Sequence, residues 1–370
     1  MRIATILGTR PDFIKAAPVS RQLAQLPDVD ETIIHTGQHY DAALSEQILE
    51  EVGLPRRRVC LSSGSGPPGQ QTGRMLEAVE KALQELKPDK VVVHGDTNST
   101  LAGALAAAKL HIPVAHVEAG VRSGDRAMAE EVNRVLTDHL ATWLYITHPA
   151  AAEPLRREGI PDSAITCIGD VTYDAVRLFT PYAGEDRLAR FHVQAGQYVL
   201  ATFHRAENTD SATHLRNIVD ALEELAAERP VLVPLHPRTQ AALGSLTLPA
   251  RMMLQWLPPQ GYLDMLALER FARLIVTDSG TVQREAYFHR APCVILRHET
   301  EWGELVTLGW ARLLPPSDGP QLRNGLRAAL ATQIPGRAGR NVLGDGCAGE
   351  RLALHLAARS EYLIMPDHRI

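Results

Sequence analysis

Short aliphatic runs recur along the whole chain, and each is followed by a polar turn and a longer amphipathic stretch. The runs have the length of buried strands, and the stretches between them have the period of helices. Alternating strands and helices are typical of βαβ units in a parallel sheet. The sequence therefore predicts an α/β fold with strands at Ile3–Leu7, Thr32–His35, Lys90–His94, Val114–Val117, Trp143–Ile146, Ile165–Ile168, Tyr198–Thr202, Val231–Pro234, Met252–Leu254, Leu274–Val276, Cys293–Leu296 and Ala311–Leu313.

The length of the chain predicts two domains. A chain of 370 residues exceeds the usual size of a single hydrophobic core. The periodicity is interrupted between Phe179 and Tyr198 by a polar, breaker-rich segment, which we interpret as an interdomain linker. We therefore expect domains at residues 1–180 and 181–347, with a cleft for a ligand. A second break, Gln333–Arg340, precedes a last helix expected at about Ala348–Leu363.

Composition narrows the class of protein. Apolar residues make up 45% of the chain, charged residues 22%, and the formal net charge is −5. No basic field points to nucleic acid or to an anionic membrane. The first residues lack the length and flanks of a signal peptide, and no apolar run approaches the roughly 20 residues of a membrane helix. We expect a cytoplasmic protein with reduced cysteines, because its four cysteines form no CxxC pair.

Polar side chains follow the predicted strands of the first half. Arg10 and Lys15 flank the start of a helix, which is either an anion site or an ordinary surface turn. Asp96 and Glu118 follow two neighbouring strands, a placement that suits paired acid and base catalysis. Glu130 and the glutamate after it add a third candidate, although acidic residues in a first helical turn often only complement the helix dipole.

The second half carries a matching set of polar residues. His204, Arg205 and Glu207 come directly after a predicted strand, and His236 follows the next one. A single histidine in such a place is more often structural, but the adjacent arginine and glutamate favour a binding site.

A phosphate-binding loop is predicted after the strand Leu274–Val276. Ser279, Gly280 and Thr281 can present backbone N–H groups at a helix N-terminus, and Glu285 could bind ribose hydroxyls. The chain lacks GxGxxG after its first strand and lacks GxxxxGK[ST], so neither nicotinamide nor P-loop chemistry is favoured. No spacing typical of metal ligands is present, and we expect no metal and no cofactor.

With these residues in place, the chain resembles the non-hydrolysing UDP-N-acetylglucosamine 2-epimerases along almost its whole length. The resemblance implies a fold of the glycosyltransferase B type, with two Rossmann-like domains, a C-terminal helix (348–370) that returns to the first domain, and a homodimer. It is carried by Gly8–Pro11 with Lys15, His35–His39, Gly95–Asn98, His116–Gly120, Glu130–Arg134, His204–Asn208, His236–Arg238, Gly261–Asp264, Thr277–Gly280 and Glu285.

The resemblance also implies a mechanism. A base removes the proton at C2 of a UDP-linked 2-acetamido sugar, UDP leaves to give a 2-acetamidoglucal, and readdition gives the epimer. Asp96, Glu118 and Glu130 are then the acid–base candidates, with roles left open among them. The departing diphosphate would be neutralised by Arg10, Lys15, His204 and the Ser279 loop. His39, Arg134, Arg205, Glu207, His236 and Glu285 complete the expected substrate-binding set.

Several positions depart from the family pattern. Thr281 replaces a glycine and Ala129 a proline, while Asp41 and Gly69 replace residues of a site where substrate acts as activator, so such activation is not expected. Thr300–Glu304 reads TEWGE instead of TERPE. This version resembles the branch acting on UDP-2,3-diacetamido-2,3-dideoxyglucuronic acid, which stays open as a substrate beside plain UDP-N-acetylglucosamine.

Three other functions remain open on the sequence alone. A glycosyltransferase of the same fold would need an acceptor groove, and a hydrolysing epimerase would release free UDP. A non-catalytic sensor of nucleotide sugars would have no use for three carboxylates near the sugar.

Overall fold

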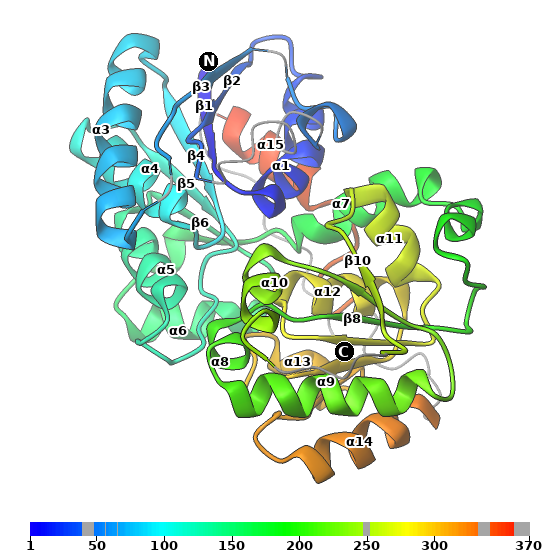
Figure 1. Ribbon diagram of the computed structural model, residues 1–370. Helices are drawn as coiled ribbons and strands as arrows, with labels where there is room; N and C mark the ends of the chain where they lie inside the picture. Colours follow the sequence, from blue (N-terminus) through cyan, green and yellow to red (C-terminus); the bar gives the residue numbers. More distant parts are fainter. Residues whose placement is uncertain (39–47, 56, 65, 247–251, 332–340, 359–370) are drawn as a thin grey trace. The chain divides into compact units, whose positions relative to one another are not determined.

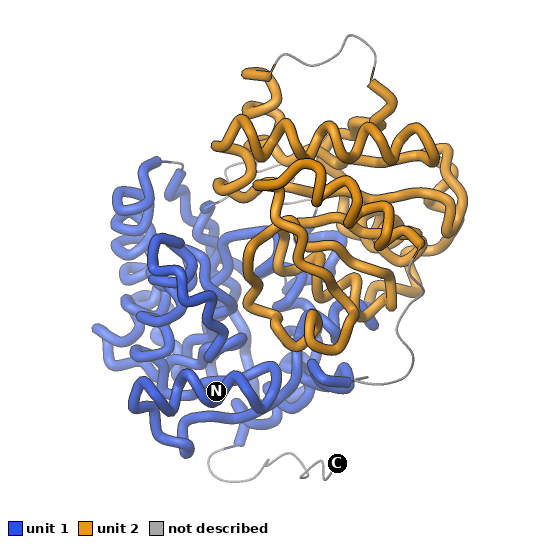
Figure 2. The backbone as a smooth tube through the Cα atoms, turned by 90° about the horizontal axis from the view of Figure 1, so that it is seen from below, with its two compact units in different colours: residues 1–178, 341–370 blue, residues 179–340 orange. Residues whose placement is uncertain are grey.

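The computed structural model describes residues 1–38, 48–55, 57–64, 66–246, 252–331 and 341–358 (Figure 1). The chain divides into two compact units, coloured separately in Figure 2. Unit 1 comprises Met1–Leu178 and Asn341–Ile370, and unit 2 comprises Phe179–Arg340.

Among the described residues of unit 1, seven strands form one parallel sheet in the order β3-β2-β1-β4-β5-β6-β7. β1 and β4 are neighbours although they are not consecutive, so the strand order reverses between them. In doubly wound folds ligands bind at this reversal, beyond the carboxyl ends of the strands. The strands are β1 (Arg2–Leu7), β2 (Asp30–His35), β3 (Arg58–Cys60), β4 (Lys90–His94), β5 (Val114–Val117), β6 (Trp143–Ile146) and β7 (Ile165–Cys167).

Helices cover both faces of this sheet because its strands are apolar on both sides. Side chains alternate between the faces, so Val92 packs in one core cluster while Val91 and Val93 pack in another. The helices of unit 1 are α1 (Arg10–Leu23), α3 (Pro68–Leu86), α4 (Asn98–Lys109), α5 (Ala129–Leu140), α6 (Ala152–Arg157), α7 (Val171–Phe179) and α15 (Ala348–Ala357). The first of the two clusters contains residues of α1 and α15, and the second contains residues of α3 and α4.

The last described helix, α15, packs against α1 in unit 1, where the two are drawn side by side in Figure 1. The Asp174 carboxylate accepts hydrogen bonds from the backbone N–H groups of Ala348 (3.2 Å) and Gly349 (2.8 Å) at its start. Near its end, His355 Nδ1 lies 2.6 Å from the Tyr145 hydroxyl. The C-terminal part of the chain therefore completes the core of the unit that the N-terminal part begins.

Unit 2 repeats the plan. Its described residues form a parallel sheet of six strands in the order β10-β9-β8-β11-β12-β13, with the reversal between β8 and β11. The strands are β8 (Val199–Thr202), β9 (Val231–Pro234), β10 (Gln255–Leu257), β11 (Leu274–Thr277), β12 (Cys293–Ile295) and β13 (Ala311–Leu313), and the helices are α8 (Ala206–Thr209), α9 (Ala212–Ala226), α10 (Pro237–Leu243), α11 (Tyr262–Arg270), α12 (Gly280–His289), α13 (Gly303–Thr307) and α14 (Gly319–Ala331). Both units thus have the Rossmann strand order, and the predicted α/β class with parallel sheets is confirmed.

The predicted strand at Met252–Leu254 is wrong. β10 begins three residues later, and Trp256 pairs with Val233. The backbone N–H groups of Met253 and Leu254 instead donate to the Glu223 carboxylate, which keeps this aliphatic run out of the sheet. β3 was not predicted, because its three residues at the sheet edge carry too short an apolar signal.

The segment expected to be a linker is folded onto unit 2. It forms two 3₁₀ helices, Thr180–Tyr182 and Glu185–Phe191. Arg187 and Arg190 form ion pairs of 2.7 and 2.6 Å with Asp264 of α11. The predicted break at 333–340 and the end of the expected last helix, from 359, lie outside the described residues.

None of the helices in the described ranges is long and apolar enough to cross a membrane. All four cysteines are free thiols.

Candidate active site

The polar residues predicted at strand ends lie beside the strand reversals of the two sheets. In unit 1 Arg10 and Lys15 belong to the helix after β1, and Asp96 and Glu118 follow β4 and β5. In unit 2 His204 follows β8 and Ser279 follows β11. Each unit therefore gathers its candidate residues where a doubly wound fold places its ligand.

The centre of the unit 1 set is a buried ion pair. Lys15 Nζ donates a hydrogen bond to Glu118 Oε2, and the two residues are only 7% and 6% exposed. Glu118 has a φ of 70°, a left-handed conformation that costs a non-glycine residue free energy. Gly95 has a φ of 65°, and a Cβ there would lie 3.3 Å from Glu118 Oε2, so a larger residue would be strained and would crowd this pair. Backbone strain and charge burial coincide at one carboxylate, as they often do in catalytic sites.

Beside this pair lies His94, which is 1% exposed and has no hydrogen-bond partner on either ring nitrogen among the described residues. Burial and then the nearby Lys15 charge lower its pKa to about 3, against the opposing effect of Glu118. His94 is therefore a neutral imidazole at physiological pH.

The helix start that the sequence suggested as an anion site is already occupied by a carboxylate of the chain itself, that of Asp12. The Asp12 carboxylate accepts from the N–H groups of Gly8 (3.1 Å) and Thr9 (3.0 Å). Burial raises the pKa of Asp12 to about 6, against the opposing effect of Lys15. Its signal in the sequence is the capping-box spacing from Thr9 to Asp12. Arg10 is half-buried, and burial lowers its pKa.

The second carboxylate of unit 1, Asp96, forms an ion pair with Arg134 of α5. Arg134 is 3% exposed and lies 3.1 Å from Glu131 as well. Glu131 also accepts from the N–H groups of Ser123 (2.9 Å) and Gly124 (3.1 Å). Glu130, by contrast, is exposed to solvent, so the buried one of these two adjacent glutamates is Glu131.

A buried network that the sequence did not reveal supports the loops after β4 and β5. His116 Nδ1 lies 2.7 Å from Asp138 Oδ1, and His116 Nε2 lies 2.7 Å from the Gly95 carbonyl oxygen. Asp138 also pairs with Arg122 at 2.7 Å. His116 and Arg122 lower the pKa of Asp138 against the effect of its own burial. Asp138 lies inside α5 with no motif around it, so no sequence signal could have found it.

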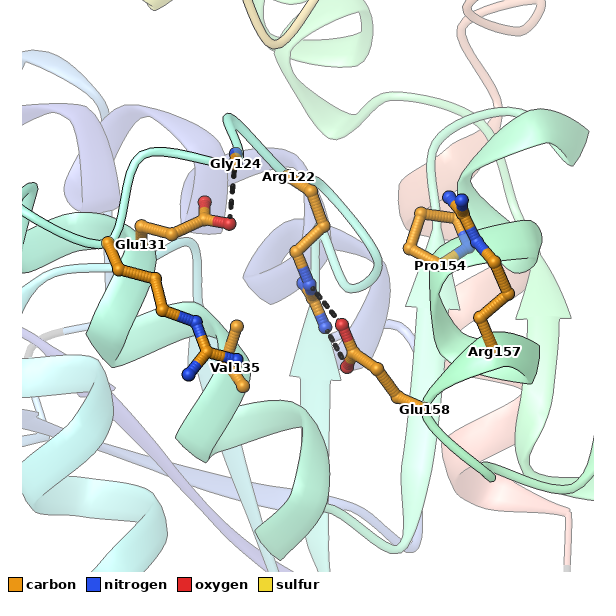
Figure 3. A pocket seen from close by; sticks show the side chains of 8 residues that line it. Arg122, Gly124, Glu131, Val135, Pro154, Arg157 and Glu158 are labelled. Carbon is orange, nitrogen blue, oxygen red and sulfur yellow. Dashed lines mark hydrogen bonds and ion pairs between the residues drawn. The ribbon is translucent and has the colours of Figure 1, made fainter.

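A pocket of about 240 Å³ opens next to this network, between α5 and α6 (Figure 3). The Arg122 guanidinium makes two hydrogen bonds to Glu158, of 2.9 and 2.7 Å, and Glu131 binds the Gly124 N–H on the same wall. Arg122, Glu158 and Glu131 of the lining are thus held by contacts within the wall. None of the predicted catalytic residues lines this pocket.

In unit 2 the loop after β8 is organised by Asp278, a residue of the Thr277–Gly280 motif that was not among the predicted site residues. Asp278 is fully buried, and its carboxylate accepts from the N–H groups of His204 and Arg205, both at 2.9 Å, and from Asn208 Nδ2 at 2.9 Å. His204 Nδ1 lies 3.2 Å from the same carboxylate, and these contacts lower the pKa of Asp278 against its burial. The His204 ring lies 4.9 Å from the ring of His236, which caps α10.

A second cluster of charges surrounds Arg297, another residue absent from the predicted set. Arg297 is 3% exposed and pairs with Glu301 (2.7 Å) and Glu207 (3.3 Å). Arg205 Nη2 lies 3.7 Å from Glu301. The predicted Arg205 and Glu207 are therefore held by one buried arginine and its glutamate.

The predicted phosphate loop begins α12. Ser279 is the N-cap, with its hydroxyl 3.4 Å from the Val282 N–H, and Gly280 and Thr281 are partly exposed. The Trp302 indole packs on this turn, since a Cβ at Gly280 would lie 3.3 Å from its Nε1. The Arg284 guanidinium lies 4.2 Å above the Trp302 ring. The TEWGE segment and the loop therefore form one packed unit.

Glu285 lies further along α12 and is 3% exposed. Burial raises the pKa of Glu269 of α11 well above its usual range, and the nearby Glu285 raises it further. His39 and Asp41 lie outside the described residues.

Comparison with known proteins agrees with this arrangement. The family model described as UDP-N-acetylglucosamine 2-epimerase matches residues 21–357. The UDP-2,3-diacetamido-2,3-dideoxy-D-glucuronate 2-epimerase of Pseudomonas aeruginosa is 43% identical over 96% of this chain and 99% of its own length. The UDP-N-acetylglucosamine 2-epimerase of Methanocaldococcus jannaschii is 41% identical over 95% of this chain and 98% of its own.

The crystal structure of the M. jannaschii UDP-GlcNAc 2-epimerase in complex with UDP-GlcNAc and UDP superposes with a TM-score of 0.88. It covers 96% of this chain and 99% of that one at 40% identity. This match confirms the predicted fold of the glycosyltransferase B type. On the family model and these full-length relatives, the chain belongs to the UDP-N-acetylglucosamine 2-epimerase family.

Proposed function

We propose that this chain is an epimerase that inverts C2 of a UDP-linked 2-acetamido sugar by elimination of UDP and readdition through a 2-acetamidoglucal. The C2 proton has no adjacent carbonyl group to acidify it. Its removal therefore has to be coupled to departure of a good leaving group from C1, and UDP is such a group. The base takes the proton, the C2 electron pair forms the C1–C2 double bond, and the C1–O bond breaks with its electrons going to UDP.

The observation that carries this proposal is the buried, strained Glu118 paired with Lys15 at the carboxyl end of β5. A carboxylate desolvated beside a lysine can exchange a proton with a substrate carbon, and Lys15 can balance its charge. Asp96, held by Arg134 after β4, is the second acid–base group. Glu130 is the third candidate, and its exposure lets it meet a substrate without disturbing the core.

In this proposal UDP is bound mainly by the candidate residues of unit 2. The N-terminus of α12 offers the N–H groups of Gly280 and Thr281 to a phosphate, with Ser279 as cap. His204 and Arg205, fixed by Asp278, add positive charge for the departing diphosphate, and Arg10 and His236 assist. Glu285 binds the ribose hydroxyls.

The test is incubation with UDP-N-acetylglucosamine in deuterated water. We expect solvent deuterium at C2 and a mixture of two UDP-sugars. Proton NMR of the anomeric signals measures both. Transfer of the sugar to an added acceptor without deuterium at C2 would identify a glycosyltransferase instead. Accumulation of free UDP in the phosphorus spectrum would identify a hydrolysing epimerase. Binding of UDP with no turnover of this sugar or of the second candidate substrate named below would identify a sensor.

A second substrate, UDP-2,3-diacetamido-2,3-dideoxyglucuronic acid, is favoured by one specific feature. Trp302 stands where the plain-sugar pattern has arginine, and it stacks with Arg284 beside the Ser279 loop. The P. aeruginosa relative, whose name states this substrate, supports the same choice. Parallel assays of both UDP-sugars decide, and the Trp302→Arg variant should shift the ratio of their kcat/KM values towards UDP-N-acetylglucosamine.

We further propose that the protein is a cytoplasmic homodimer. Val132 and Leu136, one turn apart on α5, are 43% and 46% exposed, which suits a subunit interface. Sedimentation equilibrium would contradict the dimer if the mass equalled that of one chain at micromolar concentration.

A further inference from the structure

The pocket between α5 and α6 in unit 1 presents two arginines that its own wall does not neutralise. Arg126 and Arg157 both line the pocket, and both are exposed to solvent. Within the described ranges of the chain, neither guanidinium forms an ion pair or a hydrogen bond. Two positive charges therefore border one cavity of about 240 Å³.

The glutamates of the same wall are committed to other groups. The Glu158 carboxylate accepts two hydrogen bonds from Arg122, of 2.9 and 2.7 Å. The Glu131 carboxylate accepts from the N–H groups of Ser123 (2.9 Å) and Gly124 (3.1 Å). Because each carboxylate is already held by close donors, the charges of Arg126 and Arg157 remain available to a ligand.

A comparison within α6 shows that the placement of Arg157 differs from that of an ordinary surface arginine. The neighbouring Arg156 lies in the same last turn, pairs with Asp162 at 2.6 Å and does not line the pocket. Arg157 instead lies beside Pro154 on the wall (Figure 3). Pro154 and Val135 make part of the lining apolar, and a charged contact is stronger beside apolar atoms than in open water.

We propose that this pocket binds a small anion with two acidic oxygens, a phosphate or carboxylate group, between Arg126 and Arg157. Guanidinium groups bind either kind of anion through paired N–H donors. The cavity is smaller than the usual pocket for a drug-sized ligand, which favours a small anion over a nucleotide sugar. None of the predicted catalytic residues lines it, so the site is additional to the proposed active site.

An anion in this pocket also acts on the loop that carries Arg126. That loop joins Glu118 to Glu130, and its Ser123 and Gly124 N–H groups are bound by Glu131 in the same wall. A ligand held by both arginines links the loop to α6. Binding therefore restricts opening of the segment between two of the acid–base candidates.

The first experiment is calorimetric titration of the protein with inorganic phosphate and, separately, with malonate, at low ionic strength. Excess UDP is present to occupy the loop before α12. We expect saturable binding at millimolar concentration, and Arg126→Gln and Arg157→Gln should each weaken it at least about fivefold. Arg156→Gln is the matched control and should bind as wild type does. Both arginines are exposed, so neither substitution should disturb folding, which far-ultraviolet circular dichroism checks.

The two anions distinguish the sources of the ligand. Binding of phosphate alone would identify a phosphate group, and binding of malonate alone would identify a carboxylate. Binding of neither anion, or an equal loss in Arg156→Gln, would overturn the proposal.

A second experiment follows amide hydrogen exchange of Ser123 and Gly124 with and without the anion that binds. Exchange should slow at least about threefold in wild type and stay unchanged in the Arg126→Gln/Arg157→Gln double variant. Unchanged exchange in wild type would overturn the placement of the anion on this loop. Neither experiment needs turnover, so both are independent of the epimerase assay.

Discussion

Lys15 Nζ and Glu118 Oε2 are hydrogen-bonded inside unit 1, although 103 positions separate the two residues along the chain. Glu118 reaches this contact only by adopting a left-handed backbone next to Gly95. Local sequence preferences alone would not place a glutamate in that conformation. The surrounding structure holds the carboxylate in place, and several expectations follow from how it does so.

Glu118→Gln should abolish proton exchange while leaving binding in place. The amide has the shape of the carboxylate but cannot take up a proton, so kcat should fall at least about a hundredfold. UDP affinity should stay within about threefold of wild type, since Glu118 belongs to the unit that carries no part of the proposed nucleotide loop. Deuterium incorporation at C2 and calorimetric titration with UDP check the two halves. An equal loss in both would show that Glu118 serves the structure instead.

Lys15→Met should lower the free energy of unfolding by about 3–5 kcal/mol, because it leaves the Glu118 charge buried and unbalanced. Arg156→Ala, which breaks the exposed pair with Asp162, is the matched control and should cost less than about 1 kcal/mol. Urea unfolding of both variants measures the difference. Equal small losses would mean that water reaches the Lys15 pair.

Sequence patterns located the sheets well because buried parallel strands are continuous aliphatic runs. Lys90–His94 and Val114–Val117 were predicted to the residue, since a polar turn follows each run at once. The position of β10 was predicted wrongly because Met252–Leu254 is a continuous apolar run, whereas the sheet uses the shorter segment Gln255–Leu257, which begins with a polar residue. The apolar content of a segment alone does not indicate which segment pairs with the edge of the sheet.

The candidate residues were predictable where they follow strands, and not where only the tertiary fold brings them together. Asp96, Glu118 and His204 were found by that rule. Asp138 and Glu269 lie within helices, and their roles depend on neighbours that are distant in the sequence. Similarly, no local pattern distinguishes the exposed Glu130 from the buried Glu131.

Asp278→Ala should weaken UDP binding at least tenfold. Without this carboxylate the N–H groups of His204 and Arg205 lose their acceptor, and each unsatisfied buried donor costs about 1–3 kcal/mol. Asp278→Asn retains one acceptor oxygen, so its affinity for UDP should lie between that of wild type and that of Asp278→Ala. Asp210→Ala, at an exposed carboxylate near the same loop, should bind UDP normally. Unchanged affinity in Asp278→Ala would show that the loop is held by its other contacts.

His94 should make the protein sensitive to acid. Its pKa is about 3 in the folded protein and near 6.5 in the unfolded chain, so below pH 6.5 only the unfolded chain takes up this proton. Above pH 6.5 His94 therefore has no effect on how stability depends on pH. As pH falls from 6.5 towards 3, the free energy of unfolding decreases by up to about 1.4 kcal/mol per pH unit because of this residue.

Urea unfolding of His94→Gln at pH 7.5 and pH 5.5 tests this expectation. The variant should lose less stability between the two pH values than wild type, whatever its stability at pH 7.5. His111→Asn, at an exposed position, should keep the wild-type dependence. Identical slopes for wild type and His94→Gln would show that the imidazole is protonated in the folded state.

The position of α15 has a consequence for how the protein is made. Unit 2 is one continuous stretch of chain that is synthesised before α15, whereas the core of unit 1 lacks Leu352 and Leu356 until α15 leaves the ribosome. Domains generally fold as units during synthesis. The second unit can therefore be complete on the nascent chain while the first still exposes the apolar face that α15 covers.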